Sequence, residues 1–229
     1  MDMQNETAWL NLANNPEHLI ILGRTMTGKS LLAKWLASHL NGKLLVVDPC
    51  HSPQNWNGFD VIGNVSKGDI MPRGGDYAIT QFLNQLVAEI NKRCSLLDSG
   101  CKDFENWNII LDELIAIATN ESSEKQLLEI LQLLPKAKKV KIRFLLISQS
   151  VVLPLLMKQT KPLFKQEYIT FIRLGELATR HAEKLKNKKL LDWLQMQQQP
   201  CLINDKPAVF PNATNQILSN CRKTYWGYN

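Results

Sequence analysis

The sequence lacks the features of a membrane-spanning, secreted or disulfide-stabilised protein. Its longest nearly uncharged apolar run, residues 144–157, contains Ser, Gln and Pro and is shorter than the roughly 20 apolar residues that a membrane-spanning helix needs. The first 18 residues carry acids and no basic stretch ahead of an apolar run, which argues against a secretory signal. The five cysteines form no C-x-x-C pair, which gives no support for a zinc ribbon or a disulfide framework. We therefore expect a cytoplasmic protein without a membrane span.

Acidic residues are scarce in one part of the chain. Residues 136–189 hold 14 Lys and Arg against 3 Asp and Glu, although the whole chain has a net charge of +6. Such a segment attracts polyanions and predicts contact with the phosphate backbone of DNA. The alternative is a solvated surface that balances the acidic first part of the chain.

The length bounds the number of domains. The 229 residues, 45% of them hydrophobic, suffice for one substantial core and are few for two. We expect a single domain over residues 1–229, with its core at about 17–175 and a C-terminal extension at about 176–229.

Apolar runs alternate with amphipathic segments along most of the chain. Strand-like runs occupy residues 18–23, 43–49, 108–113 and 141–150, and helical patterns occupy 29–40, 79–94 and 120–134. This alternation is typical of an α/β fold in which a mostly parallel sheet is covered by helices on both faces. Residues 49–75, rich in Gly, Pro and Asn, are expected to form a loop. Further strands are expected at 168–174 and at 200–211, where the last two form a hairpin about Asn204 and Asp205.

A phosphate-binding loop follows the first expected strand. Gly23 and Gly28 precede Lys29 and Ser30 in the pattern G-x-x-x-x-G-K-S, flanked by a strand and a helix. The loop's N–H groups and the helix start would hold phosphate oxygens, Lys29 would reach the β and γ phosphates, and Ser30 would place its hydroxyl on Mg²⁺. The predicted ATP-binding residues are Gly23, Arg24, Thr25, Met26, Thr27, Gly28, Lys29, Ser30 and Leu31.

Polar residues at the ends of two later strands complete this candidate site. Asp112 ends an apolar strand and is predicted to hold Mg²⁺ opposite Ser30. Glu113 is placed to accept a proton from the water that attacks the γ phosphate, which favours hydrolysis over transfer. Gln149 ends the next strand, at the edge where ligands of parallel sheets bind, and is predicted to sense the γ phosphate or that water. We therefore assign catalysis to Lys29, Glu113 and Gln149.

These motifs, in this order, resemble those of the FtsK/HerA class of DNA-pumping P-loop ATPases. The resemblance covers residues 19–149 and extends more weakly to the later strands. Asp48 and Pro49 are similar to the Asp-Pro-His of HerA-like members, with Cys50 inserted before His51. The resemblance implies a magnesium-dependent ATPase that assembles as a homo-oligomer, a hexameric ring, and translocates double-stranded DNA.

The chain departs from the family pattern ahead of the fourth strand and also after Gln149, where Ser150 and Val151 replace the Arg-Pro that often follows the glutamine. Where the family has a trans-acting arginine ahead of the fourth strand, this sequence has Lys138 or Lys139, and Arg143 lies within the strand. A lysine lacks the planar fork of arginine. The chain also has no room for the transmembrane and winged-helix additions of chromosome pumps, so it looks closer to compact motors that package viral genomes or serve plasmids and other mobile elements.

Two other functions remain open from the sequence. An AAA+-like switch or loader would recruit a replication or transposition partner and would need a helical lid, to which residues 177–198 could belong. The strand-like residues 200–211 that follow argue against it. A small-molecule kinase is disfavoured by Glu113, by the basic segment and by the lack of a second substrate motif.

Overall fold

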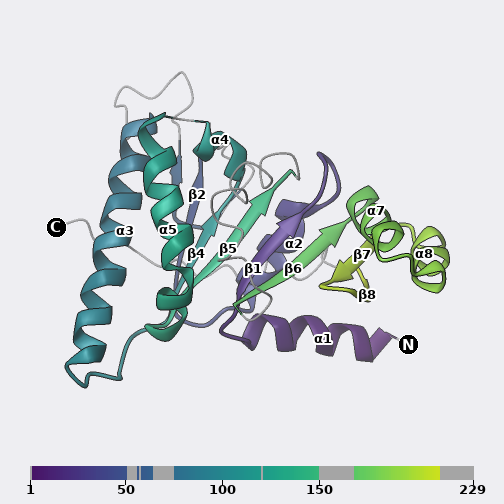
Figure 1. Ribbon diagram of the computed structural model, residues 1–229, viewed down its shortest axis with the longest axis horizontal. Helices are drawn as coiled ribbons and strands as arrows, with labels where there is room; N and C mark the ends of the chain where they lie inside the picture. Colours follow the sequence, from purple (N-terminus) through teal and green to yellow (C-terminus); the bar gives the residue numbers. More distant parts are fainter. Residues whose placement is uncertain are drawn as a thin grey trace.

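The structure is a computed structural model that describes residues 2–50, 56, 58–63, 75–119, 121–149 and 168–211. Its described strands form one 8-stranded sheet in the order β3-β2-β4-β5-β1-β6-β7-β8, parallel from β3 to β6 and antiparallel from β6 to β8 (Figure 1). The predicted α/β fold class is therefore confirmed. The strands are β1 (His18–Leu22), β2 (Lys43–Asp48), β3 (Val61–Gly63), β4 (Trp107–Leu111), β5 (Ile142–Ser148), β6 (Ile169–Leu174), β7 (Pro200–Ile203) and β8 (Lys206–Val209).

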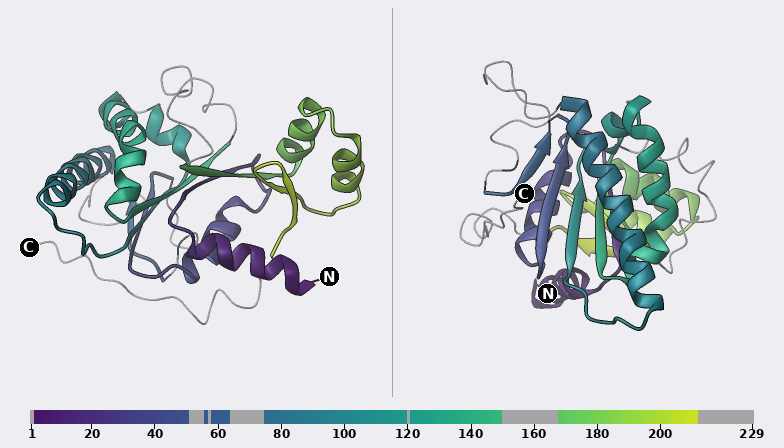
Figure 2. Two further views of the ribbon diagram at one scale, coloured as in Figure 1. Left: turned by 60° about the horizontal axis from the view of Figure 1, so that its bottom comes forward. Right: turned by 90° about the vertical axis from the view of Figure 1, so that its left-hand side faces the viewer.

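Helices cover both faces of the sheet, as the two views in Figure 2 show. Side chains alternate between the faces of a strand, so Leu19 and Ile21 of β1 pack into one apolar cluster while Ile20 and Leu22 pack into the other. The helices α3 (Gly75–Asp98), α4 (Leu114–Ala118) and α5 (Glu121–Lys139) bury residues in the cluster of Ile20, and α1 (Asp2–Asn14) and α2 (Lys29–Ser38) bury residues in the cluster of Leu19.

The first helix, α1, was not predicted, because its polar sequence has no clear apolar stripe. Arg143 at the start of β5 holds its end in place by donating hydrogen bonds to the carbonyl oxygens of Leu12 at 2.7 Å, Ala13 at 2.5 Å and Glu17 at 2.7 Å. The last carbonyl groups of a helix have no partner within the helix, and the guanidinium group supplies it here.

Two other elements differ from the sequence-based expectation. The expected loop at residues 49–75 contains the short strand β3, which pairs with β2, and the buried Trp56. The helix predicted at 120–134 continues through Pro135 to Lys139 as α5. Ala137 in its last turn is fully buried in the core, and this packing offsets the hydrogen bond that proline removes.

A pair of short helices lies beside the far end of the sheet. The helices α7 (Glu176–Lys184) and α8 (Lys188–Gln195) connect β6 to β7 and stand at the right of Figure 1. They enclose a small apolar cluster of their own against Leu202 of β7. The hairpin of β7 and β8 confirms the predicted turn, in which Asn204 adopts a φ of 53°.

The basic segment at 136–189 does not form one continuous surface in the part that the structure describes. Lys136, Lys139 and Lys141 precede β5 and lie at the edge where the parallel strands begin, whereas α7 follows the end of β6 at the opposite edge. Residues 150–167 lie outside the described residues. Among the described helices, none combines the length and the apolar composition needed to cross a bilayer.

Candidate functional site

The predicted site residues meet at one edge of the sheet. The carboxyl ends of parallel strands lie at the same edge, so residues 23–31 after β1, Asp112 after β4 and Gln149 after β5 come together there. We call residues 23–31 the phosphate loop.

Two glycines allow the tight bend of the phosphate loop. Gly28 has a φ of +85°, in the left-handed region that suits glycine. A β-carbon on Gly23 would lie 2.3 Å from Oγ1 of Thr27. Thr27 closes the bend by donating from its hydroxyl to the carbonyl of Arg24 at 2.7 Å. Met26 at the tip also has a positive φ, 66°, and its side chain is 98% exposed.

Lys29 lies inside the loop rather than in solvent. Its Nζ donates to the carbonyl of Arg24 at 3.1 Å, and the residue is only 6% exposed. Burial lowers the pKa of Lys29, while the nearby carboxylates of Glu113 and Asp112 act to raise it. The amine therefore lies inside the loop, where the sequence predicts that phosphate oxygens bind, and close to the carboxylates of Glu113 and Asp112.

The side chains of Ser30 and Asp112 face each other. The Ser30 hydroxyl, in the first turn of α2, donates to Oδ2 of Asp112 at 3.3 Å, and Leu31 follows it, partly buried, in the same turn. Asp112 is 3% exposed, and burial raises its pKa. Hydrogen bonds from Trp56, from the Glu113 backbone and from Ser30 act in the opposite direction and lower the pKa. The backbone N–H of Glu113 donates to the other oxygen, Oδ1, at 2.9 Å.

Trp56 is a site residue that the sequence did not reveal. Its indole Nε1 donates to Oδ2 of Asp112 at 2.9 Å, and the side chain is 1% exposed. Phe59 packs edge-on against the ring, with the ring centroids 5.4 Å apart. No local pattern marks this tryptophan, because its partner is 56 positions away and is reached only through the fold.

Glu113 and Gln149 form a polar chain with the phosphate loop. Gln149 Nε2 donates to Oε2 of Glu113 at 3.4 Å, and the Thr25 hydroxyl donates to Oε1 of Gln149 at 3.3 Å. Both distances are long for side-chain hydrogen bonds. Glu113 has a φ of 50° at the start of α4, a left-handed conformation that is uncommon for a side chain of this size.

Asp48 adds a second buried carboxylate beside Asp112. The Asp112 N–H donates to the carbonyl of Val47, so the two acids end neighbouring strands. Asp48 Oδ1 accepts from the Cys50 N–H at 2.9 Å, whereas Oδ2 is buried and has no hydrogen-bond partner among the described residues. Burial and, next, the charge of Asp112 raise the pKa of Asp48 to about 6. In the sequence Asp48 contributes to the family resemblance without a predicted role, and His51 lies outside the described residues.

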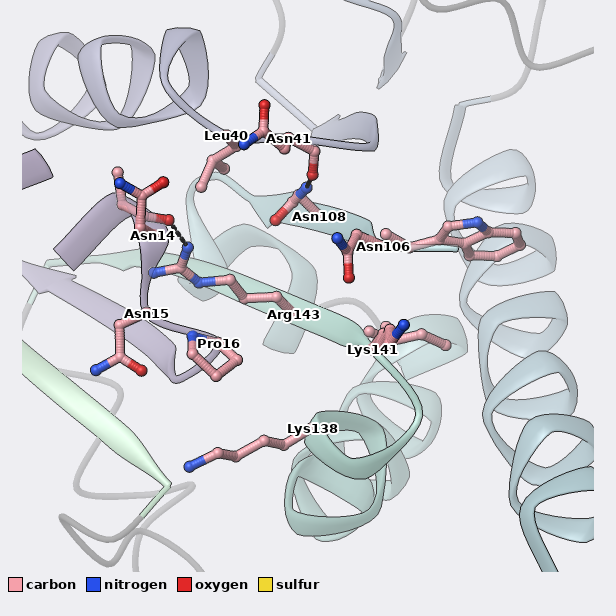
Figure 3. Close-up of a pocket in the computed structure, with 13 residues that line it drawn as sticks. Asn14, Asn15, Pro16, Leu40, Asn41, Asn106, Asn108, Lys138, Lys141 and Arg143 are labelled. Atoms are coloured by element: carbon pink, nitrogen blue, oxygen red, sulfur yellow. Dashed lines mark hydrogen bonds between the residues drawn. The ribbon is translucent and has the colours of Figure 1, made fainter. Parts of the chain in front are cut away.

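The residues considered for a trans-acting role lie at the opposite edge of the sheet. Lys138 and Arg143 line a recess of about 160 Å³ there, together with Asn14, Asn15 and Lys141 (Figure 3). In Figure 3 the Arg143 guanidinium points at the chain next to Asn14, and its carbonyl partners at the end of α1 leave it 7% exposed. Lys138 lies 3.9 Å from Glu17, and Lys139 is exposed on the last turn of α5. The fold does not bring these three residues to the phosphate loop of their own chain.

An ion pair joins the phosphate loop to α7. Arg24 Nη1 lies 2.7 Å from Oε2 of Glu176, whose other oxygen contacts Arg180. A β-carbon on Gly175, just before α7, would lie 3.1 Å from the methyl group of Thr27. The start of α7 therefore contacts the phosphate loop directly.

Solved structures of ATPases have a similar fold. One described as an ATPase matches with a TM-score of 0.53 and 13% identity over 86% of this chain and 79% of its own length. The cytoplasmic domain of the Thermomonospora curvata type VII secretion ATPase EccC matches with a TM-score of 0.50 and 14% identity over 71% of this chain. The chain covers 19% of the length of that EccC structure.

No family model and no curated protein sequence matches the chain. At identities of 13% and 14% these two structures show the fold alone. The resemblance to FtsK/HerA-type P-loop ATPases, predicted from the order of the motifs, is confirmed at the level of the fold.

Proposed function

We propose that this chain binds ATP with Mg²⁺ at the phosphate loop and hydrolyses it. The observation that carries the proposal is the 3.3 Å hydrogen bond between Ser30 Oγ and Asp112 Oδ2. A hydroxyl at the start of α2 and a carboxylate at the end of the parallel strand β4 are the pair that a magnesium nucleotide requires. Lys29 lies beside them with its amine directed into the loop.

The oxygen atoms at this edge fit Mg²⁺. The ion prefers hard oxygen ligands. Ser30, Asp112 and Oδ2 of Asp48, which has no hydrogen-bond partner among the described residues, supply them. Burial, and after it the neighbouring carboxylates, raise the pKa of Asp48 and of Asp112, and a bound cation would offset this cost of their negative charges. When bound, Mg²⁺ would neutralise charge on the β and γ phosphates.

Glu113 and Gln149 supply the groups that hydrolysis needs. An Oε atom of Glu113 would take a proton from the attacking water, and the hydrogen bond from Gln149 Nε2 orients this carboxylate. Because Gln149 also accepts a hydrogen bond from Thr25, it links the base to the phosphate loop. A phosphate that displaces Thr25 from Gln149 would therefore be sensed at Glu113.

The finer proposal is an oligomeric motor that moves double-stranded DNA, with the ring as a hexamer. Lys184, Lys186, Lys188 and Lys189 are exposed at the junction of α7 and α8, and α7 begins beside the phosphate loop at the Arg24–Glu176 ion pair. A basic surface coupled in this way to the nucleotide would grip the DNA backbone in step with ATP turnover. Virus, plasmid or other mobile-element DNA remains the proposed substrate class.

A nucleotide-dependent switch is the second candidate. The contact between α7 and the phosphate loop also suits a helical unit that changes position when ATP binds and so recruits a protein partner. EccC, which has a similar fold, is a secretion ATPase, so a protein substrate is the alternative to DNA.

Phosphate release from ATP by the wild-type chain, with and without double-stranded DNA, tests the proposal. Hydrolysis that requires Mg²⁺ and rises with DNA of any sequence would support the motor, because backbone contacts carry no base information. A rate of hydrolysis that is the same with and without DNA would favour the switch or a protein substrate. A chain that binds no ATP would refute the proposal.

A further inference from the structure

An aromatic ring from the end of the β7–β8 hairpin lies against the phosphate loop. A β-carbon built on Gly28 would lie 3.0 Å from Cζ, 3.4 Å from Cε2 and 3.8 Å from Cε1 of Phe210. These three atoms form the outer edge of the ring, so Phe210 directs its tip at the last glycine of the loop. Gly28 is thus required both for its backbone conformation and for the space that the ring occupies.

The position of Phe210 is fixed by two elements that are distant in sequence. Val209 pairs with Pro200 across the β7–β8 hairpin. Its carbonyl oxygen also accepts a hydrogen bond at 2.8 Å from the indole Nε1 of Trp9, which is 1% exposed on α1. The backbone next to Phe210 is therefore held by the hairpin and by α1, and these two contacts set where the ring meets the loop.

The ring is only partly covered. Phe210 packs at the margin of the apolar cluster that contains Leu174 and Cys201, and part of the side chain remains accessible. Apart from Met26 at the exposed tip and the partly buried Leu31, the side chains described at the phosphate loop are polar, among them Lys29, Ser30 and the Arg24–Glu176 ion pair. A charged triphosphate gains nothing from contact with a flat apolar surface. A nucleobase stacks on such a surface, because every base has a π face.

We propose that Phe210 is the base-binding residue of this site and stacks on the nucleobase of the nucleotide whose phosphates the loop holds. This inference rests on the proposed nucleotide binding. Since stacking uses the face of the base rather than its edge, Phe210 would strengthen binding of nucleoside triphosphates in general.

Binding of ATP and of inorganic tripolyphosphate, each with Mg²⁺, separates stacking from phosphate binding. Titration calorimetry would compare the full-length wild type with Phe210→Leu, which keeps an apolar side chain but has no π face, and with Phe210→Trp, which keeps one. Val209→Ala is the matched control, because this neighbouring side chain is 38% exposed and the Trp9 hydrogen bond uses only its backbone.

Phe210→Leu should weaken ATP binding about tenfold, the usual scale for loss of one base stack, and leave tripolyphosphate binding unchanged. Phe210→Trp and Val209→Ala should bind ATP like the wild type. Equal ATP affinity in Phe210→Leu and wild type would overturn the stacking role while leaving the phosphate loop intact. An equal loss for ATP and tripolyphosphate would also overturn it, because Phe210 would then only support the loop. Wild-type protein that binds neither ligand would refute the proposed function itself.

Discussion

The indole of Trp56 donates a hydrogen bond to Asp112 at 2.9 Å, on the same oxygen, Oδ2, that accepts the Ser30 hydroxyl. The tryptophan thus fixes the carboxylate that we propose as the magnesium ligand. Groups that orient a ligand in this way commonly change metal affinity by 10-fold to roughly 100-fold when they are removed.

Trp56→Phe should therefore raise the Mg²⁺ concentration needed for half-maximal ATP turnover by about tenfold, because phenylalanine keeps the packing but has no N–H. The measurement is a magnesium titration at saturating ATP. Trp107→Phe is the control, since Trp107 begins β4 at the opposite edge of the sheet. An unchanged magnesium requirement in Trp56→Phe would show that Asp112 does not depend on the indole.

Lys29→Ala should weaken ATP binding by more than about tenfold, because it removes a buried cation that would pair with charged phosphates. The fold should persist, since the hydrogen bond that Lys29 makes among the described residues is to the carbonyl of Arg24 within the loop. Titration calorimetry with Mg²⁺ measures the affinity. Lys92→Ala, which removes a lysine that is 70% exposed on α3, is the control. Equal ATP affinity in Lys29→Ala and wild type would show that the phosphate loop does not bind the phosphates of ATP.

His18 should make the stability of the fold depend on pH. Its ring is fully buried, with Nε2 hydrogen-bonded to the Leu134 carbonyl at 2.7 Å and Nδ1 accepting from the Phe144 N–H at 3.0 Å. Burial, with smaller contributions from the charges of Arg143 and Lys138, lowers the pKa of His18 to about 4. The folded state therefore holds a neutral histidine, whereas the unfolded chain binds a proton below its ordinary pKa of 6.5.

The stability that this neutral ring provides is present above pH 6.5 and is lost as the pH falls toward 4. The difference in the free energy of unfolding between wild type and His18→Gln should shrink over that window by up to about 3 kcal/mol. Taking the difference cancels the opposite trend of Asp48, whose raised pKa lowers stability as the pH rises from 3.8 to about 6. Urea unfolding between pH 7.5 and 4 measures it, and a constant difference would mean that His18 does not titrate as its burial requires.

Replacing Lys184, Lys186, Lys188 and Lys189 with glutamine should lower the affinity for double-stranded DNA. It should also reduce the salt dependence of binding, by about one unit of slope for each DNA phosphate that the variant no longer neutralises. Basal hydrolysis should persist, because the exposed side chains lie at the far end of α7 from its contact with the phosphate loop. The control is Lys136→Gln with Lys141→Gln, at the opposite edge of the sheet. DNA binding equal to wild type in the fourfold variant would leave the nucleotide-dependent switch as the function.

The phosphate loop and its acids could be predicted because their positions follow local rules. The spacing of Gly23, Gly28, Lys29 and Ser30 defines a loop between a strand and a helix, and parallel strands bring Asp112 and Gln149 to the same edge. The structure places all of these residues together. Their roles in binding and hydrolysis stay predictions.

The contacts between distant segments could not be predicted. Trp9 bonds to Val209 across 200 positions, and Arg143 to Leu12 across 131 positions, and neither pairing leaves a periodic pattern in the sequence. The helix α1 depends on such contacts, because its own sequence has no clear apolar stripe that would predict it. Trp56 and Phe210 were missed for the same reason, since each reaches the site from a segment whose path is set only by the fold.

The central claim is that Glu113 is the base for ATP hydrolysis at this loop. Glu113→Gln keeps the size of the side chain and a hydrogen-bonding group but removes the proton acceptor. ATP affinity is measured by calorimetry and turnover by phosphate release, and the substitution should change the turnover but not the affinity. We predict an affinity within about twofold of wild type and a turnover lower by roughly a hundredfold or more. Hydrolysis by Glu113→Gln at the wild-type rate, with or without DNA, would contradict the account.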